Sequence, residues 1–593
     1  MNHVKYISRY EIDQLDMIKI ILDPKAKGNY KTKTIILFQR KGVFGGKWEV
    51  IAFGITAEKK YLRLKNKTNY RLFKYFKMKL YTDNFANLTI QSVCGEKWEF
   101  TRVLSGLFEY IFLQLRESIK NYNNKLKIIL ESIQWVLTVP AIWNEQAKEI
   151  MRRSFYQAHL LIKKNSPNLI FCYEPEVAVL DFFQEKRNQL NEFKKKNILV
   201  IDAGGGTIDI TLIEPVIENN KITEFKILMI PKGGDFGSTY IDQQFIEFFQ
   251  SLLNFNENQF NLLKKNCAVG YINILNNWEK EKLSFKMDKS TEEDEYYIGI
   301  PRSVVKYLNT NYTGMKMKNM IKQFNEKNPN SKFSKIGWDN EEDRLIINGD
   351  RIKHFFKTPI NKFKEYLLNE KEKSTIFDLT DVVFFTGGLS YSDYFVNSMK
   401  KFFGSQYHYY VSAYSDKSIL HGALLFGFDP TIVTERISPY TYGAKFMVQY
   451  KPNRDAKNRI KPVTRNNQYM ELVEIFQPFV FIGEKIKLND PIKNSCWPIQ
   501  SDQKRIKTIV LRTNKEKWDT KITAVYPDSP NVTQISSFDI IIPSSQLPLI
   551  ERKFETSFNF ATTEFTINCK YLPNPTISEE LILKYNENQK KNL

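Results

Sequence analysis

The sequence has few of the residues that bind zinc. Its 593 residues include five cysteines and five histidines, all scattered along the chain, and no Cys-x-x-Cys pair occurs. Zinc sites are built from closely spaced cysteine and histidine ligands. A structural zinc site is therefore not expected.

Long apolar segments are missing as well. The N-terminal stretch "MNHVKYISRYEIDQLDMIKIILD" carries a charge every few residues and lacks the apolar core of a signal peptide. No run of about 18 apolar residues, the length that a membrane span requires, occurs in the chain. We therefore expect no membrane span and a cytoplasmic protein.

The charge balance is basic, with 87 Lys and Arg against 66 Asp and Glu, a net charge of +21. A nucleic-acid partner is one interpretation of such a surplus. However, the chain has no arginine-rich tract and no string typical of an RNA-binding module. Lysine-rich solvated surfaces explain the surplus more simply, and no nucleic-acid partner is expected.

Length and hydropathy patterning predict several globular domains. The first 430 residues mix apolar strands with amphipathic helices, including a helix over 101–120 and one that begins after Asn144, which is placed to cap it. An apolar hairpin joined through Gly45 and Gly46 is predicted over 33–57. From about 436 onward, apolar alternation and turn residues predict an all-β, sandwich-like domain.

Three segments share the order of apolar strand, glycine-containing turn and next element, at 202–209, 233–239 and 386–392. Glycine lets backbone N–H groups turn toward an anion without a Cβ in the way. In "LVIDAGGGTIDITLIE", Asp202 precedes the turn, where a carboxylate can hold the water shell of a magnesium ion. One such turn also has purely structural explanations, but three favour phosphate binding.

Specific motifs add a family resemblance. The segment "VIDAGGGTIDITL" resembles the second phosphate loop of the actin-like ATPase superfamily, in particular that of the heat shock protein 70 chaperones. Further segments resemble the same family: "LTVPAIWNEQAKEIMRRSFYQA", "CYEPEVAVL", "WEKEKLSF" and "FTGGLSYSDYF". The strings "PAIW", "FGSTYIDQQF" and "HGALLFGFDPTIVTERISPYTYG" are similar to the divergent member-12 branch.

The resemblance implies a two-lobed, actin-like (ribonuclease H-like) α/β ATPase domain followed by the all-β domain. Lobe I would comprise 1–195 together with 413–432, and lobe II would comprise 196–412. The β-rich domain would occupy 436–593 and bind protein clients or partners, as it does in the family.

The resemblance also implies that the cofactors are ATP or ADP and Mg²⁺. The β- and γ-phosphates and the water shell of the magnesium would be held by Asp202, Gly204, Gly205, Gly206 and Thr207. Asp209 would position the attacking water, and Glu174 would lie near the magnesium, although a Glu-Pro pair is also an ordinary start of a helix. The family's catalytic lysine corresponds to Lys77 or Lys79.

The adenosine side of the implied site comes from later segments. Gly237 and Ser238 would approach the ribose and phosphates, and Glu279 and Lys282 would flank the ribose and adenine. A solvent-exposed ion pair is the alternative for the last two. The adenosine would be cupped by Gly387, Gly388, Ser390 and Asp416.

The family's first phosphate loop, an Asp-hydrophobic-Gly-Thr-Thr hairpin, is not found where the resemblance predicts it. Residues 1–20 contain no glycine, and Gly28, the first glycine of the chain, has no Asp-x-Gly-Thr around it. Either the sequence as given lacks its true first segment, or the chain is a degenerate member. We expect weak nucleotide binding and weak or absent hydrolysis.

Three functions remain open at this point. The first is an ATP-binding, heat-shock-70-like protein of a chaperone type or a regulatory type. The second is a nucleotide-independent pseudo-ATPase that serves as a scaffold for protein interaction. The third, a sugar or metabolite kinase on the same superfold, is disfavoured by the β-rich C-terminal region and by the chaperone-like motifs.

Overall fold

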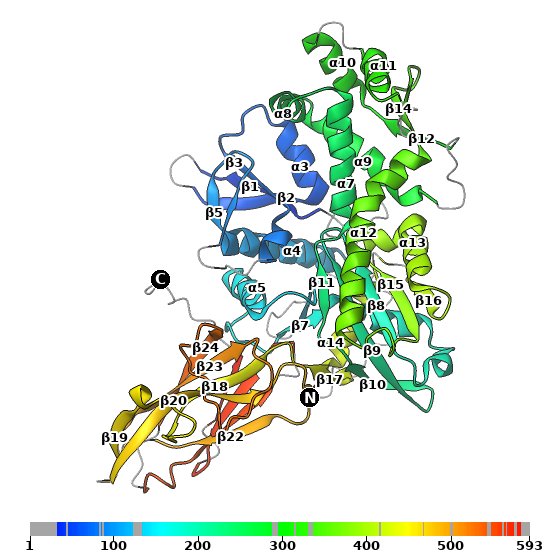
Figure 1. Cartoon of the computed structure of the whole chain (residues 1–593). Helices are drawn as coiled ribbons and strands as arrows, with labels where there is room; N and C mark the ends of the chain where they lie inside the picture. Colours follow the sequence, from blue (N-terminus) through cyan, green and yellow to red (C-terminus); the bar gives the residue numbers. More distant parts are fainter. Residues whose placement is uncertain are drawn as a thin grey trace.

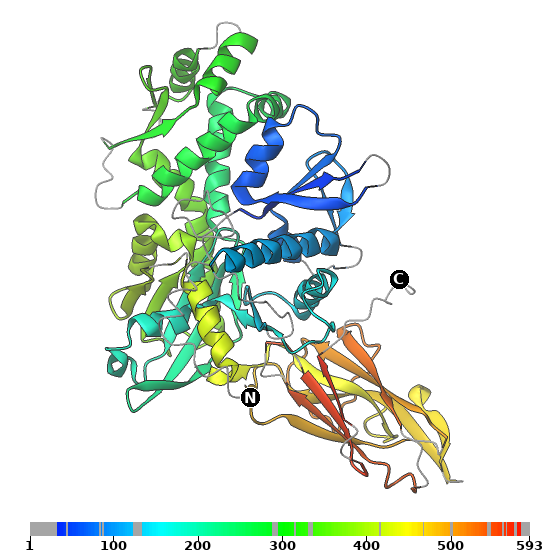
Figure 2. The same cartoon turned by 180° about the vertical axis from the view of Figure 1, so that it is seen from behind.

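The computed structural model (Figures 1 and 2) describes the following residues: 33–42, 46–81, 85, 88–122, 133–286, 294–312, 316–329, 336–413, 415, 417–465, 468–498, 502–542, 547–559, 563–564, 566–574 and 578–582. Residues 1–32, the segment in which the resemblance places the first phosphate loop, lie outside the described residues, and so does Asp416.

The first layer is a small antiparallel sheet of order β2-β1-β3, formed by β1 (Ile35–Arg40), β2 (Trp48–Phe53) and β3 (Tyr70–Lys74). Pairing of β1 with β2 confirms the predicted hairpin. Because side chains alternate along a strand, Ile35 and Leu37 pack with α3 (Gly54–Arg63), whereas Ile36 and Phe38 pack in the cluster that includes α4 (Phe100–Tyr122). Helix α4 confirms the helix predicted over 101–120.

The next segment supplies a parallel pair of strands and two helices, against which a later helix packs. Strands β6 (Trp135–Val139) and β7 (Leu169–Tyr173) pair, and α5 (Glu145–Gln157) lies between them in sequence. Asn144 caps α5 by accepting a hydrogen bond from the Ala147 N–H, as predicted. Helix α6 (Glu174–Glu185) follows β7 directly, and α14 (Ser418–Phe428) returns to pack against it. The remaining short elements of this part are β4 (Thr89–Gln91), β5 (Lys97–Glu99), η1 (Phe76–Leu80) and η3 (Leu190–Phe193).

The largest sheet has the order β16-β15-β8-β9-β10-β17-β21, with β11 paired to β9. Its strands are β8 (Ile198–Ala203), β9 (Ile208–Glu218), β10 (Lys221–Ile227), β11 (Lys232–Gly234), β15 (Val382–Thr386), β16 (His408–Val411), β17 (Val433–Ile437) and β21 (Lys485–Lys487). Strands β8 and β15 are parallel and fully buried, with Thr386 opposite Asp202. Their carboxyl ends therefore present two glycine turns at one edge of the sheet.

Helices cover this sheet and extend beyond it. They are α7 (Ser238–Leu252), α8 (Glu257–Asn266), α9 (Ala268–Ser284), α10 (Arg302–Asn311), α11 (Met317–Lys327), α12 (Gly349–Lys373) and α13 (Asp393–Phe403). A small sheet of β12 (Glu295–Gly299), β14 (Arg344–Asn348) and β13 (Gly337–Asp339) joins them. The rings of Phe245 and Trp278 stack with centroids 4.6 Å apart, and Phe355 meets Trp278 edge-on, so α7, α9 and α12 share one aromatic core.

Apart from β21, the described strands after β17 form two antiparallel sheets. One has the order β19-β20-β18-β23-β24, from β18 (Thr441–Gln449), β19 (Lys461–Arg465), β20 (Gln468–Val480), β23 (Arg505–Thr513) and β24 (Val532–Ile541). The other has the order β22-β25-β26-β27, from β22 (Ile492–Cys496), β25 (Phe554–Asn559), β26 (Thr566–Tyr571) and β27 (Ser578–Ile582). Tyr442 and Val510 of the first sheet share a core with Phe558 and Ile567 of the second. The short turns η4 (Gly388–Tyr391), η5 (Pro430–Ile432) and η6 (Lys457–Arg459) complete the elements.

Charged contacts join the C-terminal region, and the strand β17 that precedes it, to the earlier part of the chain. Arg152 of α5 is buried and donates through Nε to Glu564 Oε1 at 2.8 Å. Arg436 of β17 donates through Nη2 to Glu176 Oε2 of α6 at 2.7 Å. Buried ion pairs contribute specificity of docking more dependably than stability. No helix within the described ranges has both the length and the apolar character that a bilayer crossing needs.

The contact of α14 with α6 leads to a stability prediction. A Cβ at Gly422 would collide with the backbone carbonyl of Val177, whereas a Cβ at Gly427 would lie 2.9 Å from a methyl group of Val136. Helix propensity alone favours alanine at either position by about 1 kcal/mol. We expect Gly422→Ala to lower the free energy of unfolding by about 1–3 kcal/mol through overpacking against backbone.

Thermal unfolding followed by circular dichroism checks this, with Gly427→Ala as the matched control. The control should lose less stability, because a side-chain methyl group yields more readily than a backbone carbonyl. A Gly422→Ala protein as stable as the wild type would contradict the close approach of the two helices.

Candidate functional site

Three carboxylates from separate elements meet at the edge of the largest sheet. Oxygen atoms of Glu174, Asp202 and Asp209 all lie within 4.8 Å of one another. Glu174 is the first residue of α6, and Asp202 lies near the end of β8. Asp209 on β9 stands opposite Asp202 in the antiparallel register, because the glycine turn between them reverses the chain tightly. The spacing in "DAGGGTID" thus becomes a pair of neighbouring carboxylates.

One lysine from the N-terminal part reaches this cluster. The Nζ of Lys77 in η1 lies 2.8 Å from Glu174 Oε1. Burial disfavours the charged amine, but Glu174, Asp202 and Asp209 outweigh that effect, and the pKa of Lys77 is raised above its ordinary value. Lys77 and Lys79 are both exposed to solvent, but of the two only Lys77 pairs with Glu174. The structure therefore brings Lys77, and not Lys79, to the carboxylates.

The environment of Asp209 opposes its charge. Burial, followed by the charges of Asp202 and Glu174, raises the pKa of Asp209 well above its ordinary value, against the opposing effects of Lys77 and Thr207. Its Oδ2 accepts a hydrogen bond from the Thr207 hydroxyl at 3.3 Å, while its buried Oδ1 has no hydrogen-bond partner among the residues that the structure describes. Lys77 brings one positive charge to a cluster of three carboxylates. An oxygen-rich, electronegative site of this kind fits Mg²⁺, held directly or through its waters.

The first two glycine turns dock onto each other. The N–H groups of Gly237, Ser238 and Thr239 donate to the carbonyls of Gly206, Gly204 and Gly205 at 3.3, 3.2 and 2.9 Å. A Cβ on Gly237 would lie 2.5 Å from the Gly205 carbonyl oxygen, so only glycine permits this approach. Within the described parts of the chain, nothing accepts a hydrogen bond from the N–H of Gly205 or Gly206. These two donors can serve an anion.

The third turn closes over the end of β8. Gly387 has a φ of +85°, and a Cβ there would collide with the Ala203 carbonyl and lie 2.5 Å from Asp202 Oδ1. Gly388 begins η4 directly after it. Ser390 is buried and its hydroxyl donates to the Thr386 carbonyl, so this side chain braces the turn itself.

Lys282 is buried between α9 and α7, whereas its partner Glu279 is exposed to solvent. The Nζ of Lys282, whose side chain is fully buried, lies 2.7 Å from Asp242 Oδ1 and also pairs with Glu279. It is 3.4 Å from the Ser238 hydroxyl as well. The alternative of a solvent-exposed pair is therefore wrong for Lys282. Burial disfavours its charge, yet Asp242 and Glu279 raise the pKa of Lys282 above its ordinary value.

Sequence reasoning missed Asp242, which organises this network. Its Oδ1 also accepts a hydrogen bond from the Trp278 indole at 2.9 Å. A signal was present, because Asp242 follows Ser238 by four residues and so lies on the same face of α7. Its partners on α9, however, are about 40 residues further along the chain, where local spacing gives no indication of contact.

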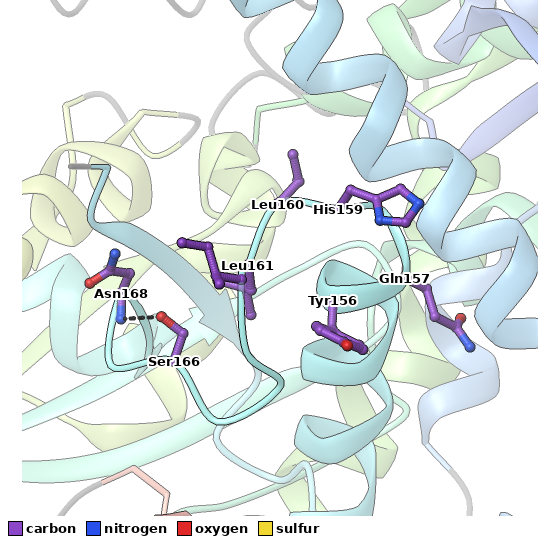
Figure 3. A pocket seen from close by; sticks show the side chains of 8 residues that line it. Tyr156, Gln157, His159, Leu160, Leu161, Ser166 and Asn168 are labelled. Carbon is purple, nitrogen blue, oxygen red and sulfur yellow. Dashed lines mark hydrogen bonds between the residues drawn. The ribbon is translucent and has the colours of Figure 1, made fainter. Parts of the chain in front are cut away.

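A separate pocket lies where α5 ends and the chain turns toward β7 (Figure 3). Tyr156, Gln157 and His159 line it on one side, and Ser166 and Asn168 line it on the other. The Asn168 N–H donates to the Ser166 hydroxyl at 3.2 Å, a hydrogen bond that joins the two residues on this second side. None of the predicted site residues lines this pocket.

Comparisons with known proteins bear on this geometry. No family model matches the chain. The chain is 23% identical to Heat shock 70 kDa protein 12A of Homo sapiens over an alignment of 595 positions, which covers 90% of this chain and 82% of that protein. It is 22% identical to Heat shock 70 kDa protein 12B of Homo sapiens, covering 80% of this chain and 73% of that protein.

These similarities over most of the chain support a divergent, member-12-like heat shock protein 70. A shorter match of 26% identity over 186 residues, 31% of this chain and 27% of the relative, links it to the Chaperone protein DnaK of Thermoplasma volcanium. Homology to this family indicates an actin-like ATPase fold with mixed α/β content and an ATP-binding protein.

The electrostatics of this heat-shock-70-like chain predict a pH-dependent stability effect at Asp209. A carboxyl group whose pKa is raised by folding binds its proton more tightly in the native state. Stability is therefore lost as pH rises from the ordinary pKa of about 3.9 through the raised value. We expect Asp209→Asn to unfold at a higher temperature than the wild type at pH 7.5, with the advantage shrinking toward pH 5.

Thermal unfolding from pH 5 to pH 8 measures this difference, and Asp539→Asn on β24 serves as the control. The Asp539 side chain is 48% exposed, so its substitution should change the free energy of unfolding by less than about 0.5 kcal/mol at any pH. A wild type that is as stable as Asp209→Asn at pH 7.5 would show that the raised pKa is wrong.

Proposed function

We propose that the chain binds Mg-ATP and Mg-ADP where Lys77 of the N-terminal part meets the carboxylates at the edge of the largest sheet. The observation that carries this proposal is the convergence of Lys77, Glu174, Asp202 and Asp209 where three glycine turns meet. Each of these residues was also expected from the family resemblance. A magnesium ion would balance the charge of the carboxylates, and phosphate oxygens would accept hydrogen bonds from the N–H groups of Gly205 and Gly206.

Each of the groups described above has a role in this proposal. The carboxylates hold magnesium through its water shell, and the free N–H groups of Gly205 and Gly206 donate to a phosphate. Lys77, which comes from η1 in the N-terminal part of the chain, neutralises phosphate charge. The magnesium ion supplies charge neutralisation at the phosphates. The Asp242 network holds Lys282 and Glu279 beside the nucleoside.

Binding with weak or absent hydrolysis is the activity that we propose. Residues 1–32 contain no Asp-x-Gly-Thr segment, so the phosphate donors identified in this sequence come from the remaining loops. Loss of one preorganised donor set lowers the rate of a hydrolase by about 10²–10³-fold. Packing of α14 on α6 supports the division into lobe I, at 1–195 with 413–432, and lobe II, at 196–412.

The C-terminal residues 436–593 form a sandwich-like domain for protein clients or partners in this proposal. The shared core of its two antiparallel sheets supports a sandwich. The role of the whole chain is then of a chaperone type or a regulatory type. Nucleotide-independent scaffolding is the alternative.

The test is calorimetric titration of Mg-ATP into the full chain, with Lys77→Ala and Lys79→Ala as a matched pair. Both substitutions remove one lysine from η1, but only Lys77 contacts Glu174. A charge-assisted hydrogen bond contributes about 1.5–3 kcal/mol, which corresponds to a loss of about 10- to 150-fold in affinity. We expect Lys77→Ala to show this loss, Lys79→Ala to bind like the wild type, and Asp202→Ala to bind weakly or not at all.

The outcomes separate the candidate functions. Absence of binding by a folded wild-type protein would reject the ATP-binding proposal and favour the scaffold. Equal affinities of the two lysine variants would reject the role given to Lys77.

A further inference from the structure

Tyr75 has an unusual backbone conformation beside the candidate site. It stands between β3 and η1, two residues before Lys77, and its φ is +54°. A bulky aromatic residue rarely adopts this left-handed conformation. The Tyr75 N–H donates to the Thr34 carbonyl at 2.7 Å, which holds the backbone in place. Strained residues of this kind cluster where a ligand is bound.

The side chain of Tyr75 does not serve the hydrophobic core. The neighbouring Phe73 and Phe76 are buried, with exposed fractions of 0% and 1%, whereas Tyr75 is 56% exposed. The left-handed backbone therefore turns one ring of this aromatic segment out of the core. Packing of the N-terminal sheet gives no reason for that exposure.

The exposed ring interacts electrostatically with residues of three helices. The charges of Glu58 of α3 and Asp242 of α7 act on the Tyr75 hydroxyl, which in turn acts on the hydroxyl of Tyr271 of α9. Helix α3 contacts α9, and Figures 1 and 2 show α3 beside these helices. Partial burial, followed by the charges of Glu58 and Asp242, raises the pKa of Tyr75 to about 12, so its hydroxyl stays protonated at neutral pH.

Asp242 connects this ring to the candidate site. The same carboxylate pairs with Lys282 and accepts the Trp278 indole. Lys282 in turn pairs with Glu279 and lies near Ser238, next to the docked glycine turns. Asp242 therefore links the ring of Tyr75 electrostatically to a charged network that borders the glycine turns. A nucleoside, with one aromatic and one hydroxyl-rich part, matches an aromatic ring and a charged network chemically.

We propose that Tyr75 is a nucleoside-contacting residue that packs its ring against the base or sugar of the bound nucleotide. This inference rests on the proposed nucleotide binding and adds to it a contact from the N-terminal part of the chain. A second explanation is that Tyr75 acts as a latch, bridging Glu58 and Asp242 through its hydroxyl without touching the ligand. The two explanations predict different responses to the loss of the ring and to the loss of the hydroxyl.

The experiment compares Mg-ADP with magnesium tripolyphosphate, which carries phosphates but no nucleoside. Each is titrated calorimetrically into the full-length wild type, Tyr75→Asn and Tyr75→Phe. Asparagine tolerates a left-handed backbone, so Tyr75→Asn removes the ring without new strain. Phenylalanine keeps the ring and removes the hydroxyl. Tyr156→Asn, at an exposed tyrosine of the separate pocket, is the matched control.

We expect Tyr75→Asn to weaken Mg-ADP binding about tenfold or more, the size of loss that follows removal of one aromatic stacking partner. Tripolyphosphate affinity should stay unchanged in the same variant. Tyr75→Phe and Tyr156→Asn should bind Mg-ADP within about threefold of the wild type, because neither loses the packing ring.

Three results would overturn the inference. Wild-type affinity for Mg-ADP in Tyr75→Asn would show that the ring does not contact the nucleoside. A comparable loss in Tyr75→Phe would assign the effect to the hydroxyl and hence to a latch. If the folded wild type binds neither ligand, the proposed function fails together with this inference, a result that differs from the loss of Mg-ADP binding in one variant.

Discussion

The parallel pairing of β8 with β15 is the constraint on which the candidate site depends. Both strands are fully buried, and their register sets Thr386 opposite Asp202. Two glycine turns therefore leave the sheet side by side, and Gly387 can close over Ala203 because it has no Cβ. The antiparallel return of β9 then sets Asp209 opposite Asp202, and the second glycine turn docks through three backbone hydrogen bonds. A shift of one residue in this register would separate all of these groups.

The site that results is locally unfavourable to the folded chain. Three carboxylates lie close together beside Lys77, Asp209 has a buried oxygen without a hydrogen-bond partner among the described residues, and Tyr75 holds a left-handed backbone two residues before Lys77. Each feature opposes folding on its own, and all of them belong to the same region of the chain's fold. Such a concentration of local conflict within a well-packed protein is typical of a binding site, where a ligand supplies the missing partners.

The same region also connects to the C-terminal sheets. Glu174 and Glu176 are two residues apart at the start of α6, yet the first joins the carboxylate cluster and the second pairs with Arg436 of β17. Strand β17 continues the largest sheet and pairs with β21, which comes from the later part of the chain. The start of one helix thus positions a group of the site and anchors the segment that leads into the C-terminal sheets.

The sequence by itself determined the local features of this protein. Glycine turns after apolar strands, the spacing of Asp202 and Asp209, the cap at Asn144 and the helix over 101–120 all follow from preferences within a few residues. The family motifs added Glu174 and Lys282. The tertiary structure alone decided between Lys77 and Lys79, because the choice depends on Glu174, 97 residues away. It also revealed Asp242, the burial of Lys282 and the turned-out ring of Tyr75, since each depends on how distant elements pack.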